Sequence, residues 1–122
     1  MKPFAFGDNP KMADELLDLV LQGRKTATSW AAAHRAKGET VGSRMTIMDG
    51  QNRPRVVIEV TELRCLPFKD VDAAFAHEEG EGNRSLAYWR KEHQEFFTRE
   101  GTFSDDMKVY CQRFKVVEVV SV

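Results

Sequence analysis

Hydrophobic residues change their spacing along this chain, from the period of a helix to the period of a strand and back. A first helix is predicted over residues 10–22 because one face carries an apolar stripe, made of Ala13, Leu16, Leu17, Val20 and Leu21. Asp8 and Asn9 are candidate N-caps, Pro10 suits the first helical position, and Gly23 suits the C-terminal stop.

The middle of the chain shows the alternation of strands. A strand is predicted over residues 44–48, where Met45 and Ile47 share a face. A longer strand before Pro67 has one apolar face, formed by Val56, Ile58 and Val60. Helical spacing then returns, with a short helix over residues 71–78 capped by Asp70. A longer helix, stopped by Gly101, carries a stripe made of Leu86, Trp89, His93, Phe96 and Phe97.

The closing segment, residues 107–119, is predicted to be a strand. Its apolar residues Cys111 and Phe114 have opposite parity, so we expect a bulge near Gln112 and Arg113. The order of helix, strands, helices and strand predicts an α+β domain in which helices surround a curved or closed sheet.

Length and composition fit one globular domain over residues 1–122. Eighteen basic and nineteen acidic residues give a net charge of -1, which excludes a strongly polybasic binder but not a local basic patch. No apolar run approaches the roughly 18 residues of a membrane helix, and the first residues lack the apolar stretch of a secretory signal. We therefore expect a cytoplasmic protein without membrane partners.

Cys65 and Cys111 lack the spacing of a zinc or redox motif, and we expect both to be buried.

The segment after the first helix is the first candidate site. Two cations, three hydroxyls and an aromatic follow one another there, as Arg24, Lys25, Thr26, Thr28, Ser29 and Trp30. An ordinary structural explanation exists, because cations favour helix C-termini and threonines favour strands. The functional interpretation is a lysine that activates a nearby hydroxyl as a nucleophile. Because Lys25 follows the helix instead of lying on its stripe, we expect its loss to leave the fold intact.

A cluster of carboxylates forms the second candidate site. Glu78, Glu79 and Glu81 lie between two predicted helices, beside Gly80 and Gly82. Such a cluster is commonly a solvated loop; alternatively, a carboxylate there acts as an acid, a base or a metal ligand.

The remaining polar and aromatic residues give weaker signals. His93 lies on an apolar stripe and is predicted to be a core residue, and the histidines lack the spacing of a zinc site. Trp30 suits either the core or stacking on a base. Arg44 and Arg84 are scattered in sequence, and only folding can gather such cations into a phosphate-binding rim.

Two ordered motifs resemble the ASCH domain family. The opening, Phe6-Gly7-Asp8 followed by Gly23-Arg24-Lys25-Thr26-Ala27-Thr28, is similar to the start of an ASCH domain. Residues 79–86, with Tyr88-Trp89-Arg90 and His93, resemble its later signature. The resemblance spans nearly the whole chain and implies a small PUA-like β-barrel flanked by helices, with a cleft that receives RNA.

The resemblance also implies an activity. Some family members are ribonucleases on single-stranded RNA, and smaller members hydrolyse the acetyl amide of N4-acetylcytidine with a lysine, a threonine and a glutamate. These three residues correspond to Lys25, Thr28 and Glu79, with Glu81 close enough to compete with Glu79.

Three interpretations therefore stand. The first is an RNA- or nucleoside-directed hydrolase in which Lys25, Thr28 and Glu79 are catalytic. A partly desolvated cleft would lower the pKa of Lys25 so that its amine takes a proton from Thr28, and Glu79 would carry the proton to the departing amine. Contacts to single-stranded RNA or a modified nucleoside would come from Arg24, Thr26, Ser29, Trp30, Arg44, Glu81 and Arg84. No resident metal is assigned, although a ribonuclease would suit Mg²⁺ or Mn²⁺ near the carboxylates. The second is a binding module without catalysis, and the third is a regulatory domain with a vestigial site.

Overall fold

The chain forms five strands and three α-helices in the residues that the structure, a computed structural model, describes: 2–7, 9–34 and 40–120. The strands are β1 (Lys2–Phe4), β2 (Ala27–Ala31), β3 (Arg44–Met48), β4 (Pro54–Pro67) and β5 (Lys108–Val119). The α-helices are α1 (Pro10–Leu21), α2 (Ala73–Glu79) and α3 (Leu86–Glu100). Two short 3₁₀ turns, η1 (Ala32–His34) and η2 (Phe68–Asp70), complete the described elements. The predicted α+β class is confirmed.

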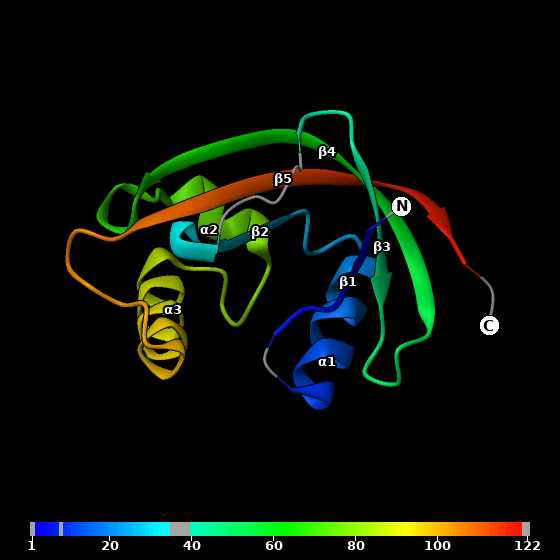
Figure 1. The fold of residues 1–122 in the computed structure, drawn as a ribbon, viewed down its shortest axis with the longest axis horizontal. Coiled ribbons are helices and arrows are strands. Elements are labelled where there is room, and N and C mark those ends of the chain that lie inside the picture. Colours follow the sequence, from blue (N-terminus) through cyan, green and yellow to red (C-terminus); the bar gives the residue numbers. More distant parts are fainter. Residues whose placement is uncertain (1, 8, 35–39, 121–122) are drawn as a thin grey trace.

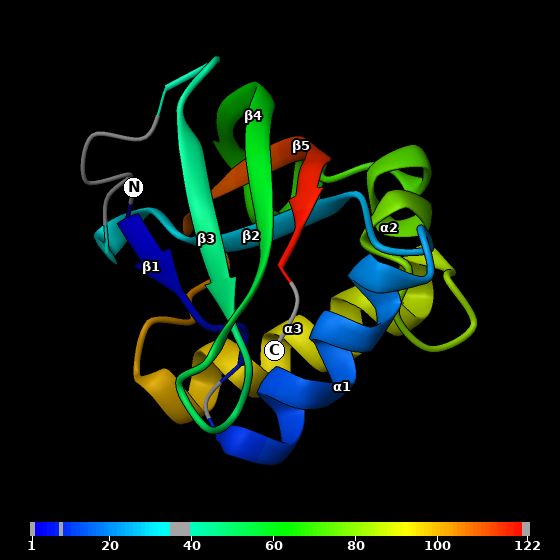
Figure 2. The same cartoon turned by 90° about the vertical axis from the view of Figure 1, so that its right-hand side faces the viewer.

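One mixed sheet carries the fold, in the order β1-β3-β4-β5-β2. β1 runs parallel to β3, and every other neighbouring pair is antiparallel. The long strands β4 and β5 arch over the helices, with α1 beneath one end and α2 and α3 beneath the other (Figure 1). A second view shows β1 at the sheet edge beside β3 (Figure 2).

The expected closed barrel is not confirmed. In the described residues β1 and β2 are the two edges of the sheet and do not pair with each other. The arch is curved instead of closed, because β1 is only three residues long and pairs with β3 alone.

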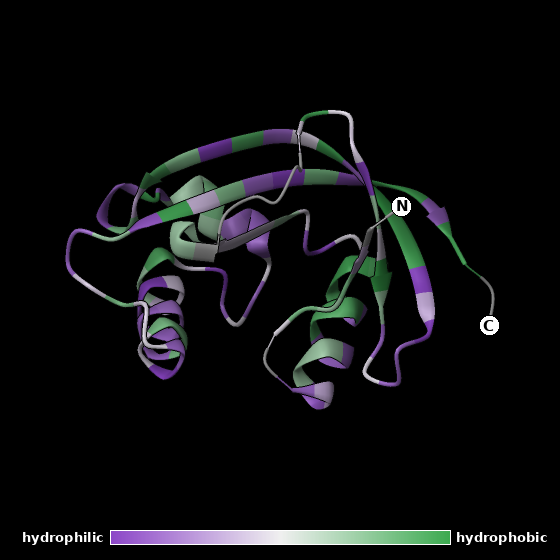
Figure 3. Ribbon diagram, viewed as in Figure 1, coloured by the Kyte–Doolittle hydropathy of each residue, from purple (hydrophilic) through white to green (hydrophobic). Residues whose placement is uncertain are grey.

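Two hydrophobic clusters fill the space under the arch. The first packs α2 and α3 against β2 and β5 around Trp89, Phe97 and Cys111. The second packs α1 against β3 and β4 around Leu17, Ile47 and Ile58. Hydrophobic and hydrophilic bands follow one another along β4 and β5 (Figure 3), and the buried residues of β4 include the consecutive Val56, Val57 and Ile58.

The helix caps explain where each helix begins. Asn9 caps α1 by accepting a hydrogen bond from the Met12 amide, as predicted, whereas Asp8 lies outside the described residues. The expected cap of α2 is wrong: Asp72 accepts from the Phe75 amide, and Asp70 belongs to η2. The helix starts two residues later than predicted because Val71 is extended and buried.

A register shift lies near the expected bulge, but the extra residue is on the neighbouring strand. Between Arg113 and Phe114 of β5 the ladder skips Thr61 of β4, and a second shift skips Val117 of β5. Of the two cysteines, Cys111 is buried as expected but Cys65 is exposed. Among the described residues, no helix is long and apolar enough to cross a membrane.

Candidate functional site

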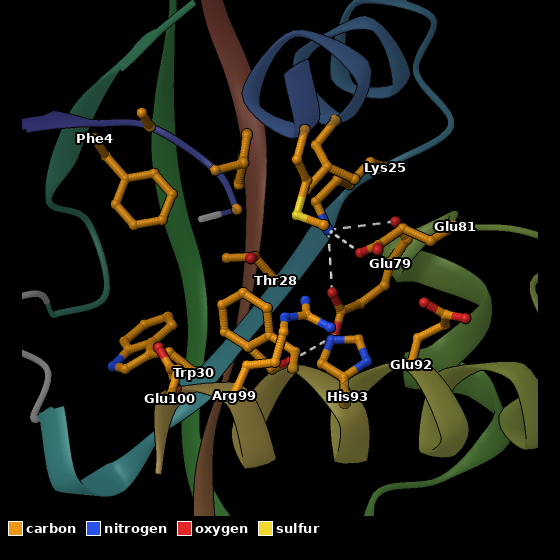
Figure 4. A pocket seen from close by; sticks show the side chains of 17 residues that line it. Phe4, Lys25, Thr28, Trp30, Glu79, Glu81, Glu92, His93, Arg99 and Glu100 are labelled. Carbon is orange, nitrogen blue, oxygen red and sulfur yellow. Dashed lines mark hydrogen bonds and ion pairs between the residues drawn. The ribbon is translucent and has the colours of Figure 1, made fainter. Parts of the chain in front are cut away.

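A cavity of about 210 Å³ opens between the two edge strands of the sheet. Its wall combines the segment after β1, the start of α1, β2, the end of α2 and one face of α3 (Figure 4). The polar lining residues are Lys25, Thr28, Ser29, Glu79, Glu81, Glu92, His93, Arg99 and Glu100. Polar groups from distant segments of the chain therefore meet between β1 and β2, where the sheet does not close.

Lys25 turns inward directly after α1. Gly23 adopts φ +75° there, and the amides of Arg24 and Lys25 both donate to the Leu19 carbonyl, which reverses the chain. The Lys25 side chain is 1% exposed, and its Nζ lies 3.0 Å from Glu79 Oε1 and 3.0 Å from Glu81 Oε2. The ammonium also lies 5.4 Å from the centroid of the Phe6 ring. Lys25 is therefore a buried cation held by two carboxylates (Figure 4).

Glu79 is the last residue of α2, and it is buried. Its Oε2 accepts hydrogen bonds from Ser29 Oγ and from Trp89 Nε1, each at 2.6 Å. His93 Nε2 lies 3.6 Å from the same oxygen. Gly80 follows with φ +74°, and a Cβ there would lie 2.4 Å from the Arg24 carbonyl oxygen. Glycine is therefore required for this loop to approach the turn that carries Lys25.

The ion pair determines the charge state of the pocket. Burial alone would lower the pKa of Lys25, but the charges of Glu79 and Glu81 outweigh burial and raise this pKa above its ordinary value. Burial alone would raise the pKa of Glu79, but the charge of Lys25, then that of His93, and the hydrogen bonds from Ser29 and Trp89 lower it to about 2. At neutral pH the resting pocket therefore holds an ammonium and a carboxylate.

Burial changes two expectations about Lys25. We expected its loss to leave the fold intact, as a surface substitution would, but the side chain is buried and paired. We also expected burial to lower its pKa so that the amine could accept a proton from Thr28. The two carboxylates reverse that direction.

Strand β2 brings the hydroxyls to the pocket. Thr28 and Ser29 both line the cavity, and Thr28 is 8% exposed. Only Ser29 bonds to Glu79; among the described residues the Thr28 hydroxyl has no hydrogen-bond partner, so it is open to a ligand. Trp30 also lines the cavity and stacks on Tyr110 at 5.6 Å between centroids.

Four predicted contact residues lie outside the cavity wall. Arg24 donates from Nε to the Gly80 carbonyl at 2.7 Å, and Arg84 donates from Nε to the His77 carbonyl at 3.0 Å. Thr26 joins the same junction, because its amide donates to the Glu78 carbonyl at 2.8 Å. These residues fasten the Glu79–Gly82 loop to the turn after α1. Arg44 instead pairs with Glu59 on the exposed face of β3 and β4.

The cavity wall carries more negative than positive charge. Among the residues that the structure describes, its cations are Lys25 and Arg99, and its carboxylates are Glu79, Glu81, Glu92 and Glu100. A phosphate placed inside would face four carboxylates at close range, and this repulsion is strong where water is excluded. The pocket therefore favours an uncharged ligand.

A metal ion is the usual alternative partner for clustered carboxylates. Donor atoms of Glu79, Glu81 and His93 lie within 4.8 Å of one another, a spacing that a metal can bridge. The Lys25 ammonium, however, bonds both carboxylates, and a divalent cation beside it would be repelled. The charge that a metal would supply is already present as a lysine, and we assign no metal ligands here.

Sequence reasoning missed four polar pocket residues, which all lie on α3: Glu92, His93, Arg99 and Glu100. Of these, His93 was predicted to be a core residue. Its spacing on the apolar stripe of α3 indicated a core residue, and its ring does stack on Trp89, but it also lines the cavity. His93 belongs to the later ASCH-like motif, but its contact with Glu79 of α2 depends on the fold and not on the spacing within α3.

Comparisons with known proteins agree on one family. The sequence model of the ASCH domain matches residues 2–118. A solved ASCH domain from Lactobacillus crispatus JV V101 is 32% identical, with a TM-score of 0.84; the match covers 94% of this chain and 78% of that chain. A solved protein from Enterococcus faecalis V583 is 33% identical, with a TM-score of 0.88; that match covers 98% of this chain and 77% of the other.

A solved ASCH protein from Zymomonas mobilis shares the fold alone. It is 9% identical, with a TM-score of 0.61, and the match covers 88% of this chain and 68% of that chain. No curated protein sequence matches this chain.

Proposed function

This chain belongs to the ASCH domain family, whose PUA-like fold is generally an RNA-binding one, and from that premise we propose that its pocket hydrolyses an acyl amide on a modified nucleoside. N4-acetylcytidine is the substrate class that the resemblance implies. Lys25, Thr28 and Glu79 are the proposed catalytic residues. Trp30 and Ser29 are the proposed contacts to the base and sugar.

The observation that carries the proposal is the buried Lys25–Glu79 pair on the same cavity wall as the Thr28 hydroxyl, which has no hydrogen-bond partner in the described part of the chain. Amide hydrolysis needs a nucleophile at the carbonyl carbon, a positive group at the carbonyl oxygen and a route for a proton to the amine. Thr28 is suited to be the nucleophile, and the Lys25 ammonium is suited to be the positive group. Because the Lys25 side chain is 1% exposed, little water screens the charge of its ammonium.

Charge distribution favours a nucleoside over an RNA strand. Cleavage of RNA requires a phosphodiester at the reactive groups, and four carboxylates line the cavity. An uncharged acylated base avoids that repulsion. For this reason we rank the amide hydrolase above the ribonuclease, and we expect RNA contacts, where they occur, to be weak and salt-dependent.

In the proposed reaction, Lys25 acts as a cation. Its ammonium donates a hydrogen bond to the acyl oxygen and stabilises the negative charge that develops there. The Thr28 oxygen, or a water that Thr28 holds, attacks the carbonyl carbon, and the C–N bond to the base breaks. Glu79 keeps Lys25 charged and oriented, since both oxygens of its carboxylate are already hydrogen-bonded.

Turnover of N4-acetylcytidine tests the proposal. The purified protein should release cytidine and acetate, quantified by chromatography, and Thr28→Val, which keeps the shape of threonine without its hydroxyl, should lose this activity. Thr46→Val is a matched control, since Thr46 lies on β3 outside the cavity wall. Cytidine binding without turnover would instead favour the binding-module alternative. Cleavage of labelled single-stranded RNA would favour the ribonuclease.

A further inference from the structure

We propose that His93 is the proton-transfer residue of this pocket. Its Nε2 accepts the proton that the attacking oxygen loses and passes that proton to the departing amine. This inference rests on the proposed amide hydrolysis and adds a catalytic residue that the Lys25–Thr28–Glu79 set does not contain.

Hydrogen bonding fixes which nitrogen of His93 can exchange a proton. Nδ1 lies 2.9 Å from the backbone carbonyl oxygen of Trp89, one turn earlier in α3. A carbonyl oxygen only accepts, so Nδ1 carries the hydrogen. In the neutral ring the lone pair is therefore on Nε2, which lies on the side of Glu79 and the cavity (Figure 4).

Trp89 holds the imidazole and the carboxylate in one arrangement. The His93 ring stacks on the Trp89 indole with centroids 4.3 Å apart and planes at 17°. The same indole donates from Nε1 to Glu79 Oε2, and His93 Nε2 lies 3.6 Å from that oxygen. An imidazolium formed at His93 would lie beside the Glu79 carboxylate, which stabilises the positive charge.

The other two charged groups at the reaction site, Lys25 and Glu79, are poorly suited to accept the proton. The Lys25 ammonium has no lone pair while it bonds Glu79 and Glu81. The Glu79 oxygens accept from Lys25, Ser29 and Trp89. The low pKa of Glu79 makes this carboxylate a weak base as well. The charged groups that share the cavity with His93 are Lys25, Glu79, Glu81, Glu92, Arg99 and Glu100.

The proton balance closes over one turnover. The bond from the attacking oxygen to the acyl carbon forms, and its proton moves to Nε2. The C–N bond then breaks, and the proton moves from Nε2 to the departing nitrogen, which leaves as the free amine. If Thr28 is the attacking group, a water repeats the sequence on the acyl ester, and the proton returns to the threonine oxygen. His93 is neutral again after the amine departs, and again after the acyl ester is hydrolysed.

Replacement of His93 by glutamine, with His77→Gln as the matched control, tests the role. Glutamine offers a polar amide but cannot carry a proton, whereas His77 lies on α2 outside the cavity wall. We expect His93→Gln to lower kcat by about 100-fold or more with KM within a few-fold. We expect the pH profile of kcat in this variant to differ from that of the wild type, because glutamine has no proton that the reaction can exchange. In His93→Ala, added imidazole should restore part of kcat, which a merely structural role does not predict.

The outcomes separate the two proposals. Active wild-type protein together with full kcat in His93→Gln would overturn the role of His93 and leave the hydrolase intact. The role of His93 would also be overturned by two results together. Folded His93→Ala would lose kcat without rescue by imidazole, and His93→Gln would keep the wild-type pH profile. Wild-type protein that hydrolyses no acylated cytidine would overturn the hydrolase, and the role of His93 with it.

Discussion

Lys25 Nζ lies 3.0 Å from Glu79 Oε1, although 54 positions separate the two residues in the chain. Both side chains are almost fully buried, with 1% and 2% of their surfaces exposed. Since a buried charge is tolerated only when it is paired, this contact ties the end of α2 to the turn after α1. The same contact sets the charge state of the pocket.

Lys25→Ala is expected to lower the free energy of unfolding by about 3–5 kcal/mol, because it leaves Glu79 as a buried charge without its main partner. Lys115→Ala is the matched control, since Lys115 also pairs with a carboxylate, Glu59, but is itself exposed. Such exposed pairs contribute about 0–1 kcal/mol. Urea unfolding of both variants measures the difference, and an unchanged midpoint for Lys25→Ala would contradict a stabilising buried pair.

Lys25→Arg separates charge from proton transfer at this position. Arginine keeps the positive charge but does not lose its proton near neutral pH. Because the carboxylates raise the pKa of Lys25, we expect a cationic role, with kcat for Lys25→Arg at least about 10-fold above that of Lys25→Ala. Circular dichroism checks that both variants fold. Equal inactivity in two folded variants would instead indicate that the amine itself carries a proton.

Acid should weaken the fold through Glu79. Its pKa in the folded protein, about 2, lies below the ordinary value of 4.5, so the ionised carboxylate stabilises the folded state above the ordinary value. This stabilisation is lost as the pH falls from about 5 toward 2. In Glu79→Gln the free energy of unfolding should change less over that range, as measured by urea unfolding at several pH values. Parallel curves for the two proteins would show that other carboxyl groups dominate acid unfolding.

Chelation should not affect turnover. The Lys25 ammonium occupies the position between Glu79 and Glu81 that a divalent cation would otherwise bridge. We therefore expect equal hydrolysis rates with EDTA and with added Mg²⁺ or Mn²⁺. A rate that collapses with EDTA and returns with either metal would instead support metal-dependent chemistry at the carboxylates.

Cytidine should bind more tightly than its 5′-monophosphate, because four carboxylates line the cavity. We expect at least a several-fold difference in Kd by calorimetry, decreasing as added salt screens the repulsion. Glu92→Gln, which removes one of these charges, should narrow the gap, whereas Glu118→Gln on β5, outside the cavity wall, should leave it unchanged. Tighter binding of the monophosphate would contradict the assignment of an uncharged ligand.

Local periodicity was sufficient to predict most helices and strands. The predicted helix over residues 10–22 is observed as Pro10–Leu21, with Asn9 as its cap. Apolar spacing and capping chemistry act within one or two helical turns, so they are visible in the sequence. The cap of α2 was misassigned because Asp70 and Asp72 are equally good caps by local criteria. The burial of Val71, which depends on the fold, decides between them.

The sequence by itself determined the α+β class, the order of α1, β3, β4, α2, α3 and β5 and, through two motifs, which residues are candidates for the site, but it did not reveal the edge strands β1 and β2. Only the tertiary structure decided what those residues do to one another. In the tertiary structure the sheet is open and Lys25 is buried against two carboxylates. Arg24 and Arg84 donate to backbone carbonyls instead of lining the cavity. The tertiary structure also turned His93 toward Glu79. Burial and charge pairing depend on groups dozens of positions apart, and no local spacing in a sequence records which of them will meet.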